Sequence, residues 1–235
     1  MPKSEDKRII FVIVEGLSDE AALGLALEKV FMNEKVVVQV TYGDITTRKG
    51  VTPDNIIKEV DKFVKQYQKN YHFKKSDFLG IIHIADTDGA FINNDFVIED
   101  SSLAGTVYSL DEIRTFNKVS IEKRNRQKRN NLGRLSVTKQ IASIPYRVFY
   151  MSSNLDHVLY DKQISTDSEK EFDAHLFAKR YKDDIKGFLK FICESSFSVP
   201  GNYKETWDFI KQGKNSLHRH TNLGICLKNK GVKDL

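Results

Sequence analysis

Two short apolar runs constrain the fold of this chain more than any other feature. Residues 8–14 read RIIFVIV and residues 78–85 read FLGIIHIA. Runs of this length, rich in β-branched residues, suit strands that are buried on both faces, as in a parallel sheet with helices on either side. A membrane-spanning helix needs about 20 consecutive apolar residues. We therefore expect a buried parallel sheet and no membrane association.

Segments with helical periodicity alternate with the strand-like runs. Apolar residues recur at helical spacing over residues 20–31, directly after the first run, and Ser18 is a suitable N-cap. The sequence further predicts strands at 36–42 and 146–151, a helix that begins at 52–54, and helices over 156–161 and 173–194. Strands that alternate with helices indicate an α/β fold with a mainly parallel sheet flanked by helices.

The composition favours one folded protein of the cytoplasm. The chain has 235 residues, of which 40% are hydrophobic and 29% charged, so it can bury a core. Its first residues, MPKSEDKR, lack the apolar stretch of a signal peptide. Cys193 and Cys226 form no CxxC pair, which argues against a cysteine-built zinc site and fits a reducing compartment. The net charge of +5 permits a nucleic-acid partner without requiring one.

Acidic residues follow several of the predicted strands. Glu15 ends the first run, Asp86 and Asp88 end the third strand, and Asp156 follows the strand at 146–151. In open parallel sheets, functional groups gather beyond the carboxyl ends of the strands. One such carboxylate is commonly a helix cap or a solvated turn, but several together repel one another unless a cation neutralises them. We therefore expect Mg²⁺ or Mn²⁺ here, and Asp19, four residues after Glu15, could join a second metal.

Two of these segments resemble the signature motifs of the Toprim domain. The segments are FVIVEGLSDEAAL, at residues 11–23, and IIHIADTDGAF, at residues 81–91. The Toprim domain is shared by type IA and II topoisomerases, bacterial primases, small ribosomal RNA maturases and OLD-family nucleases. The resemblance covers residues 8–92 well and extends more loosely to about 160. It implies a Toprim-like catalytic domain at 8–160, with a C-terminal helical extension at 161–235 packed on it.

The resemblance implies roles for individual carboxylates. Glu15 would be the catalytic or metal-linked glutamate, and Asp86 and Asp88 would be Mg²⁺ ligands. The acid at Asp19 matches OLD-type and maturase-like members, which use an added carboxylate there for a second metal. NLDHVLY, at residues 154–160, looks like the further acidic motif of nuclease-type members, which would put Asp156 in the metal shell.

The departures from the family narrow the expected activity. Nothing in the chain resembles a topoisomerase tyrosine domain or a primase zinc module, which leaves metal-dependent hydrolysis of phosphodiester bonds in DNA or RNA. OLD nucleases usually carry an ATPase, but the sequence has no GxxxxGK[ST] motif, so any ATPase would be a separate subunit. Small Toprim proteins of this kind are often found in phage defence. The alternative is a non-catalytic Toprim-like sensor or toxin subunit that binds a partner protein or nucleic acid.

A basic segment interrupts the alternation at residues 114–139, which contain nine Lys or Arg and one acid, Glu122. Such a segment suits a phosphate backbone, although runs of like charge are usually solvated faces. The expected nucleic-acid contacts are Lys123, Arg124, Arg126, Lys128 and Arg129.

The C-terminal part contains a second polar cluster, KNSLHRHTN, at residues 214–222. Lys214 and Arg219 are candidate cations beside the scissile phosphate, where they would stabilise developing negative charge. A polar turn is the equally weighted alternative. For His83, within the third strand, we expect a structural, hydrogen-bonded side chain. The sequence leaves open DNA or RNA, endo- or exonuclease action, one or two metals, and the oligomeric state.

Overall fold

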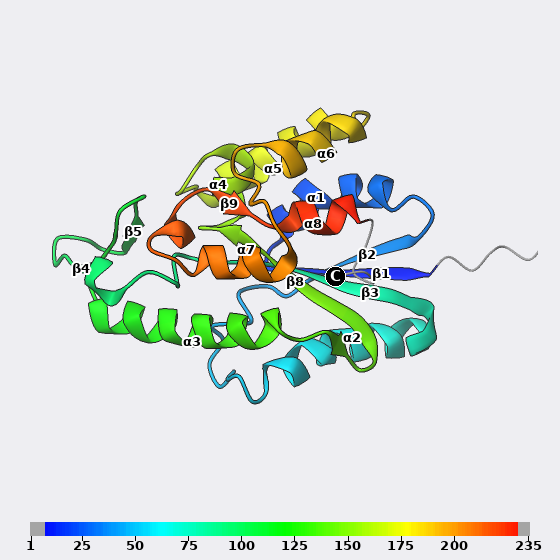
Figure 1. The fold of residues 1–235 in the computed structure, drawn as a ribbon, viewed down its shortest axis with the longest axis horizontal. Helices are drawn as coiled ribbons and strands as arrows, with labels where there is room; N and C mark the ends of the chain where they lie inside the picture. The colour runs from blue at the N-terminus through cyan, green and yellow to red at the C-terminus, as the bar shows by residue number, and fades with distance from the viewer. Residues whose placement is uncertain (1–7, 230–235) are drawn as a thin grey trace, which may run out of the picture.

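The computed structural model describes residues 8–229 and shows an α/β fold built on a central sheet (Figure 1). Its strand order is β2-β1-β3-β8-β7, with β9 also paired to β8. The strands are β1 (Ile9–Val14), β2 (Lys35–Val40), β3 (Phe78–Asp86), β7 (Gln140–Ile141), β8 (Ile144–Ser152) and β9 (His220–Thr221). β2, β1, β3 and β8 are parallel, whereas β7 and β9 run antiparallel to β8. The prediction of an α/β fold with a mainly parallel sheet is therefore confirmed.

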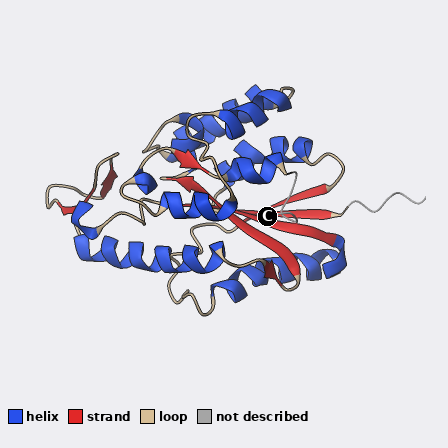
Figure 2. Ribbon diagram, viewed as in Figure 1, coloured by secondary structure: helices blue, strands red, loops and turns tan. Residues whose placement is uncertain are grey.

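Helices cover both faces of this sheet, as Figure 2 shows in blue against the red strands. One face carries α1 (Leu17–Val30), α4 (Leu155–Tyr160), α5 (Asp167–Tyr181), α6 (Ile185–Glu194) and α8 (Leu223–Lys228). The other face carries α2 (Ile56–Tyr71), α3 (Lys118–Ser136) and α7 (Tyr203–Ile210). Short 3₁₀ helices occupy Lys75–Asp77, Asn94–Phe96 and Asn215–Leu217.

The first apolar run is buried on both faces because helices lie on both sides of it. Val12 and Val14 pack into the core beneath α1, and Phe11 and Ile13 pack into the core beneath α2. Every residue of β1 is buried. Because each fully buried Val, Ile or Phe side chain contributes about 1.5–3 kcal/mol, this strand is a major source of stability for the sheet.

The structure differs from the sequence prediction at several points. The helix expected over 173–194 is two helices, α5 and α6, because the chain breaks after Tyr181 and Asp184 caps α6 by accepting a hydrogen bond from the Gly187 N–H at 2.8 Å. A second, small sheet was not predicted. It has the order β4-β6-β5 and consists of β4 (Val97–Glu99), β5 (Thr106–Tyr108) and β6 (Ile113–Thr115). Three-residue strands are too short to show an alternating pattern.

The basic segment folds back onto the sheet. Most of it is the 19-residue helix α3, which buries Leu132 and Leu135 in the core shared with α2. The part of the C-terminal extension that the structure describes, residues 161–229, is also integrated: it contributes β9 to the sheet, and the backbone N–H of Tyr150 in β8 donates to Asn222 Oδ1 at 2.9 Å. Residues 230–235 of that expected extension lie outside the described residues.

In residues 8–229, every helix is too short or too polar to span a bilayer. His83 lies buried in β3, and its Nδ1 lies 2.8 Å from the Tyr146 hydroxyl. This contact is the structural role predicted for His83.

The packing of α8 on the sheet predicts that the C-terminal part unfolds together with the rest. Leu223 is 0% exposed in the core on the α1 face. We expect Leu223→Ala to lower the free energy of unfolding by about 2–5 kcal/mol, in one cooperative urea transition. Leu176→Ala is the control, because Leu176 on α5 is 46% exposed and should change stability by about 0.5 kcal/mol or less. A separate early transition for the C-terminal part would contradict this integration.

Candidate functional site

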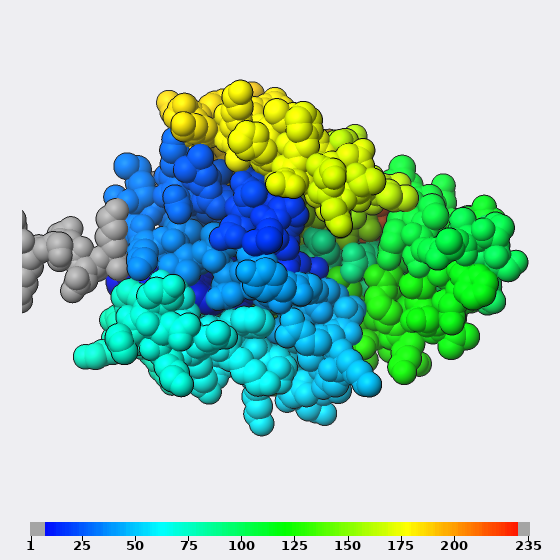
Figure 3. All heavy atoms as spheres, turned by 180° about the vertical axis from the view of Figure 1, so that it is seen from behind, coloured from blue at the N-terminus to red at the C-terminus, as the bar shows by residue number. Residues whose placement is uncertain are grey.

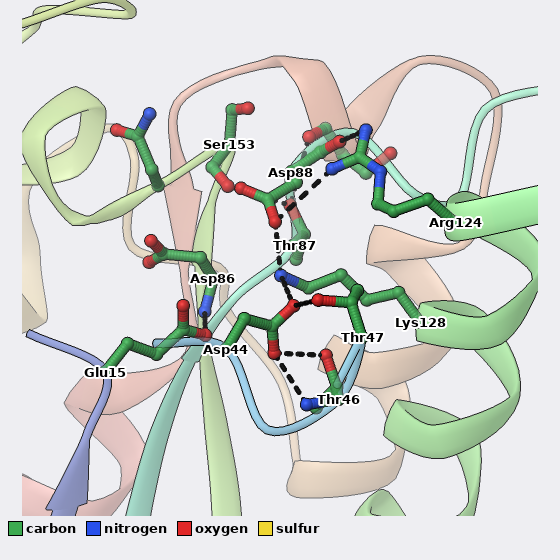
Figure 4. Close-up of polar contacts among 12 residues, drawn as sticks. Glu15, Asp44, Thr46, Thr47, Asp86, Thr87, Asp88, Arg124, Lys128 and Ser153 are labelled. Atoms are coloured by element: carbon green, nitrogen blue, oxygen red, sulfur yellow. Dashed lines mark hydrogen bonds and ion pairs between the residues drawn. The ribbon is translucent and has the colours of Figure 1, made fainter. Parts of the chain in front are cut away.

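The carboxyl ends of the parallel strands bring four acidic residues to one edge of the sheet. Glu15 follows β1, Asp44 follows β2, Asp86 ends β3, and Asp88 lies in the turn after β3. Figure 4 shows them together, with Glu15 beside Asp86. Glu15 Oε1 accepts a hydrogen bond from the backbone N–H of Asp86 at 3.1 Å, so the first and third strands are linked directly at the site. Glu15 and Asp86, which are 71 positions apart in the sequence, thus lie in direct contact.

The Asp86 carboxylate is the open acidic group of this edge. It makes no hydrogen bond or ion pair with any of residues 8–229. It lines a cleft of about 1010 Å³ together with Glu15 and Asp19, and Figure 3 shows the surface formed there by the blue start of α1 and the yellow start of α5. Asp86, Asp19 and Asp156 also line a small cavity of about 40 Å³. That volume exceeds what one water molecule needs, so a small cation also fits.

Asp19 and Asp156 lie in the first turns of α1 and α4, beside Asp86 in the lining of the small cavity. Asp19 Oδ2 accepts from the Gly16 N–H at 2.9 Å in the first turn of α1. Asp156 is 6% exposed in the first turn of α4, whose N-cap Asn154 accepts from the His157 N–H at 2.8 Å. Acidic residues near a helix N-terminus are favourable there. Both carboxylates therefore lie where negative charge is favourable, and both line the small cavity.

Asp88 points to a different set of partners. Its carboxylate forms an ion pair and hydrogen bond with Lys128 of α3, and Arg124 Nη1 lies 3.4 Å from Asp88 Oδ2. Lys128 Nζ also lies 3.0 Å from Asp44 Oδ2. Asp44 in turn accepts hydrogen bonds from the Thr46 N–H at 2.7 Å and the Thr47 hydroxyl at 2.8 Å. Figure 4 shows Lys128 between the two aspartates.

The turn that carries Asp88 has a demanding backbone. Asp88 has φ 45° and Gly89 has φ 64°, both in the left-handed region that favours glycine. A Cβ on Gly89 would stand 2.5 Å from Leu217 Cδ2, so any larger residue there would force the buried Leu217 side chain to move. The turn is fastened from both sides, because the Asp88 N–H donates to Ser153 O at 2.7 Å and the Thr87 hydroxyl donates to Ser216 O at 3.1 Å.

Burial and neighbouring charges shift the pKa values of these carboxylates in opposite directions. Burial raises the pKa of Glu15 to about 8 despite the opposing charge of Lys128. Burial, reinforced by the charges of Glu15 and Asp19, holds the pKa of Asp86 well above its usual value. Burial would also raise the pKa of Asp44, but Lys128 and the threonine hydrogen bonds lower it to about 2. Thus Asp44 stays ionised and Glu15 retains its proton at neutral pH, while Asp86 favours its protonated form more than a solvated aspartate does.

The structure separates the other predicted site residues. Lys214 forms an ion pair with Asp111 at 3.0 Å, and Arg219 donates to the Val158 carbonyl at 2.8 and 3.0 Å. Neither lines the cavities of Asp86. The grouping of the basic residues needs a correction: Lys128 is 0% exposed and belongs to the carboxylate site, because the inner face of α3 turns it toward the sheet edge.

The remaining basic residues of the expected nucleic-acid surface divide into two pairs. Arg124 and Arg129 bind loop carbonyls, since Arg124 donates to Asp88 O at 3.3 Å and Arg129 to Ile92 O at 3.1 Å. Lys123 and Arg126 are exposed and line one hollow next to residues 50–53. These two side chains are therefore the ones of this group most available to a ligand.

Sequence reasoning missed three residues of the site. Asp44 lies four residues after the end of β2, whereas Glu15 directly follows β1, and this place beyond a strand end was the available signal. Lys170 of α5 lines both cavities of Asp86, and its Nζ has no hydrogen bond or ion pair with the described part of the chain. Tyr42 lines the larger cleft, is 77% exposed and has φ 54°. No sequence pattern distinguished Lys170 or Tyr42 from ordinary surface residues.

The fit of a divalent cation can be judged from these contacts. Among residues 8–229, no group of three or more His, Cys, Asp or Glu side chains is arranged so that it could hold a metal ion. Asp88 is engaged by Lys128, which leaves Glu15 and Asp86 as the central oxygen donors. Hard divalent cations prefer such oxygens, and the open carboxylate of Asp86 lacks the positive partner that burial demands. These two residues, with Asp19 and Asp156 near Asp86, are therefore the oxygen donors that could hold Mg²⁺ or Mn²⁺.

No model of a known protein family matches this chain, and no curated protein or solved structure matches it either.

The raised pKa values predict how the stability of the metal-free protein depends on pH. Groups such as Glu15, whose pKa is about 8 in the folded state, bind more protons folded than unfolded, so stability falls as pH rises toward 8. Burial lowers the pKa of His83 to about 4, so this group makes stability rise with pH. Its effect is confined to pH values below about 6.5, the pKa of His83 in the unfolded chain. We therefore expect Tm without metal to fall between pH 6.5 and 8. Thermal unfolding with chelator would measure it.

Glu15→Gln is the matched variant for this pH dependence. It removes one titrating carboxyl, so its Tm should change less over the same pH range. Mg²⁺ should raise the Tm of the unsubstituted protein more at pH 8 than at pH 6.5, because fewer protons must then be displaced. A Tm that rises toward pH 8 without metal would contradict the raised pKa of Glu15.

Proposed function

We propose that this protein is a Mg²⁺- or Mn²⁺-dependent nuclease of the Toprim type, which hydrolyses phosphodiester bonds in DNA or RNA. The observation that carries the proposal is the open Asp86 carboxylate, which faces a cleft beside Glu15 at the carboxyl edge of the parallel sheet. The resemblance of residues 11–23 and 81–91 to the Toprim motifs supports the same reading. A pure binding module gains nothing from burying carboxylates without partners, which cost free energy.

The residues of the cleft have distinct parts in this proposal. Glu15 and Asp86 would hold the cation, with Asp19 and Asp156 close to Asp86. The bound cation would supply Lewis acidity and a water of lowered pKa. Without it Glu15 holds a proton at neutral pH, since its pKa is about 8, and cation binding releases this proton.

The cleft also contains groups suited to the rest of a nucleotide. Lys170 is the basic side chain that lines both cavities together with Asp86. It would therefore bind the substrate phosphate, the role that the sequence suggested for Lys214 and Arg219. The exposed ring of Tyr42 offers a face on which a base can stack, an interaction that contributes about 1–3 kcal/mol per base. A substrate strand would thus place its phosphate near Lys170 and a neighbouring base on Tyr42.

The biological setting follows from the same resemblance. The sequence contains no phosphate-binding GxxxxGK[ST] loop, so nucleotide hydrolysis would come from a separate ATPase subunit. Small Toprim proteins of this kind are often found in phage defence, so we propose phage defence as the biological context of this protein.

The direct test is cleavage by the purified protein of DNA and tRNA pools with Mg²⁺, Mn²⁺ or chelator. We expect cleavage only with a divalent cation, and we expect Glu15→Ala and Asp86→Asn to abolish it. Loss of an outer-shell partner of a metal typically lowers activity 10–100-fold, and loss of a direct cation ligand should lower the cleavage rate at least as much. Lys204→Ala on α7 is a control, because within residues 8–229 the Lys204 ammonium pairs with Asp208 on the same helix and with no other residue. Absence of cleavage under all conditions would favour the non-catalytic sensor or toxin subunit.

The exposed part of α3 generates a separate binding prediction. Lys123 and Arg126 are three residues apart on this helix and line one hollow. Each phosphate contact on duplex DNA adds about 0.9 to the magnitude of the slope of log K against log salt. Replacing both with Gln should therefore reduce the slope by up to about 1.8, as measured by fluorescence anisotropy over a salt series. An unchanged slope would assign this face of α3 to solvent or to a protein partner.

A further inference from the structure

We propose that Lys128 is a built-in cation that occupies the Asp44 and Asp88 half of the site, so that the protein binds one divalent cation, at Glu15 and Asp86. This inference rests on the proposed function and deepens it, because it fixes the number of metal ions. Lys128 is a positioning residue: its side chain is fully buried, so it cannot touch a substrate.

The contacts of Lys128 are those of a bound cation. Its Nζ lies 3.0 Å from Asp44 Oδ2 and donates a hydrogen bond to Asp88 Oδ2. Arg124 adds a second positive group, 3.4 Å from the same Asp88 oxygen. Figure 4 shows the ammonium group between the two aspartates. A divalent cation at this position would have to displace the Lys128 ammonium or lie beside it, and like charges in a buried site repel strongly.

Lys128 is held in place by contacts along α3. Asn131 donates to the Thr46 carbonyl at 2.7 Å, and Gln127 donates to the Val51 carbonyl at 3.0 Å. Both contacts fasten the helix to the loop that carries Asp44. The ammonium group is therefore fixed relative to its aspartates by the fold, and no flexible side chain has to find them.

Charge balance distinguishes the two halves of the site. Lys128 and Arg124 supply two positive charges to Asp44 and Asp88, which carry two negative charges. The charge of Lys128 also reaches Glu15 and Asp86, but neither forms an ion pair within residues 8–229, and when ionised they together match the charge of one divalent cation. Asp88 therefore acts as an outer partner of the centre, whereas Asp86 is a direct ligand.

The test measures Mn²⁺ binding to the intact protein by isothermal titration calorimetry, without any activity assay. We expect one Mn²⁺ per chain. Asp88→Asn should keep that stoichiometry, with a loss of affinity no larger than the 10–100-fold of an outer partner. Asp86→Asn should abolish measurable binding. Two Mn²⁺ per unsubstituted chain, or loss of binding in Asp88→Asn, would overturn the inference and leave the proposed nuclease standing.

A second set of variants tests Lys128 itself. Lys128→Met removes the ammonium group at similar length, and we expect the variant to take up a second Mn²⁺, which should raise its Tm more than that of the unsubstituted protein. The double variant Lys128→Met/Asp88→Asn should return to one Mn²⁺. Lys123→Met, on the exposed side of α3, is the matched control and should stay at one. If Lys128→Met does not fold, the comparison of Asp88→Asn with Asp86→Asn still tests whether the protein binds one cation at Glu15 and Asp86.

The outcomes separate this inference from the proposed function. One bound Mn²⁺ without any cleavage of DNA or RNA would support the single-cation site and count against the nuclease. Absence of Mn²⁺ binding to the unsubstituted protein would overturn both.

Discussion

The pairing of Lys128 with Asp44 and Asp88 is the interaction on which the geometry of the site depends. It joins α3, the loop after β2 and the turn after β3, three segments that are distant in the sequence. Buried ion pairs add little net stability, because desolvation offsets their attraction, but loss of one partner typically costs about 3–5 kcal/mol. This pairing engages the carboxylates of Asp44 and Asp88, whereas the Asp86 carboxylate forms no ion pair within residues 8–229.

The sequence predicted the central sheet because its strands are long and apolar. Residues 8–14 and 78–85 could hardly form anything else, and their order along the chain placed Glu15 and Asp86 at one edge. The small sheet of β4, β5 and β6 escaped prediction because strands of three residues have no period to detect. The break between α5 and α6 was equally hidden, since no glycine or proline separates them.

The site was harder to predict from sequence than the fold, because it depends on which side of a helix faces inward. In a run of charges such as 123–129, Lys128 looks like its neighbours. Its burial follows from helical phase, because Lys128, Leu132 and Leu135 lie on one face of α3 and the two leucines enter the core. Lys170 escaped for a related reason: it approaches the site from α5, through tertiary packing that no local motif records.

The contacts of Ser216 and Asn222 with the turn after β3 and with β8 have a consequence for synthesis of the protein. Thr87 is bonded to Ser216, which lies 129 residues further along the chain. At roughly 5–20 residues per second, a ribosome needs several seconds to travel that distance. During this interval the nascent chain has its carboxylates but lacks the segment that fastens their turn. The order of synthesis thus delays completion of the site until the last part of the described chain has been made.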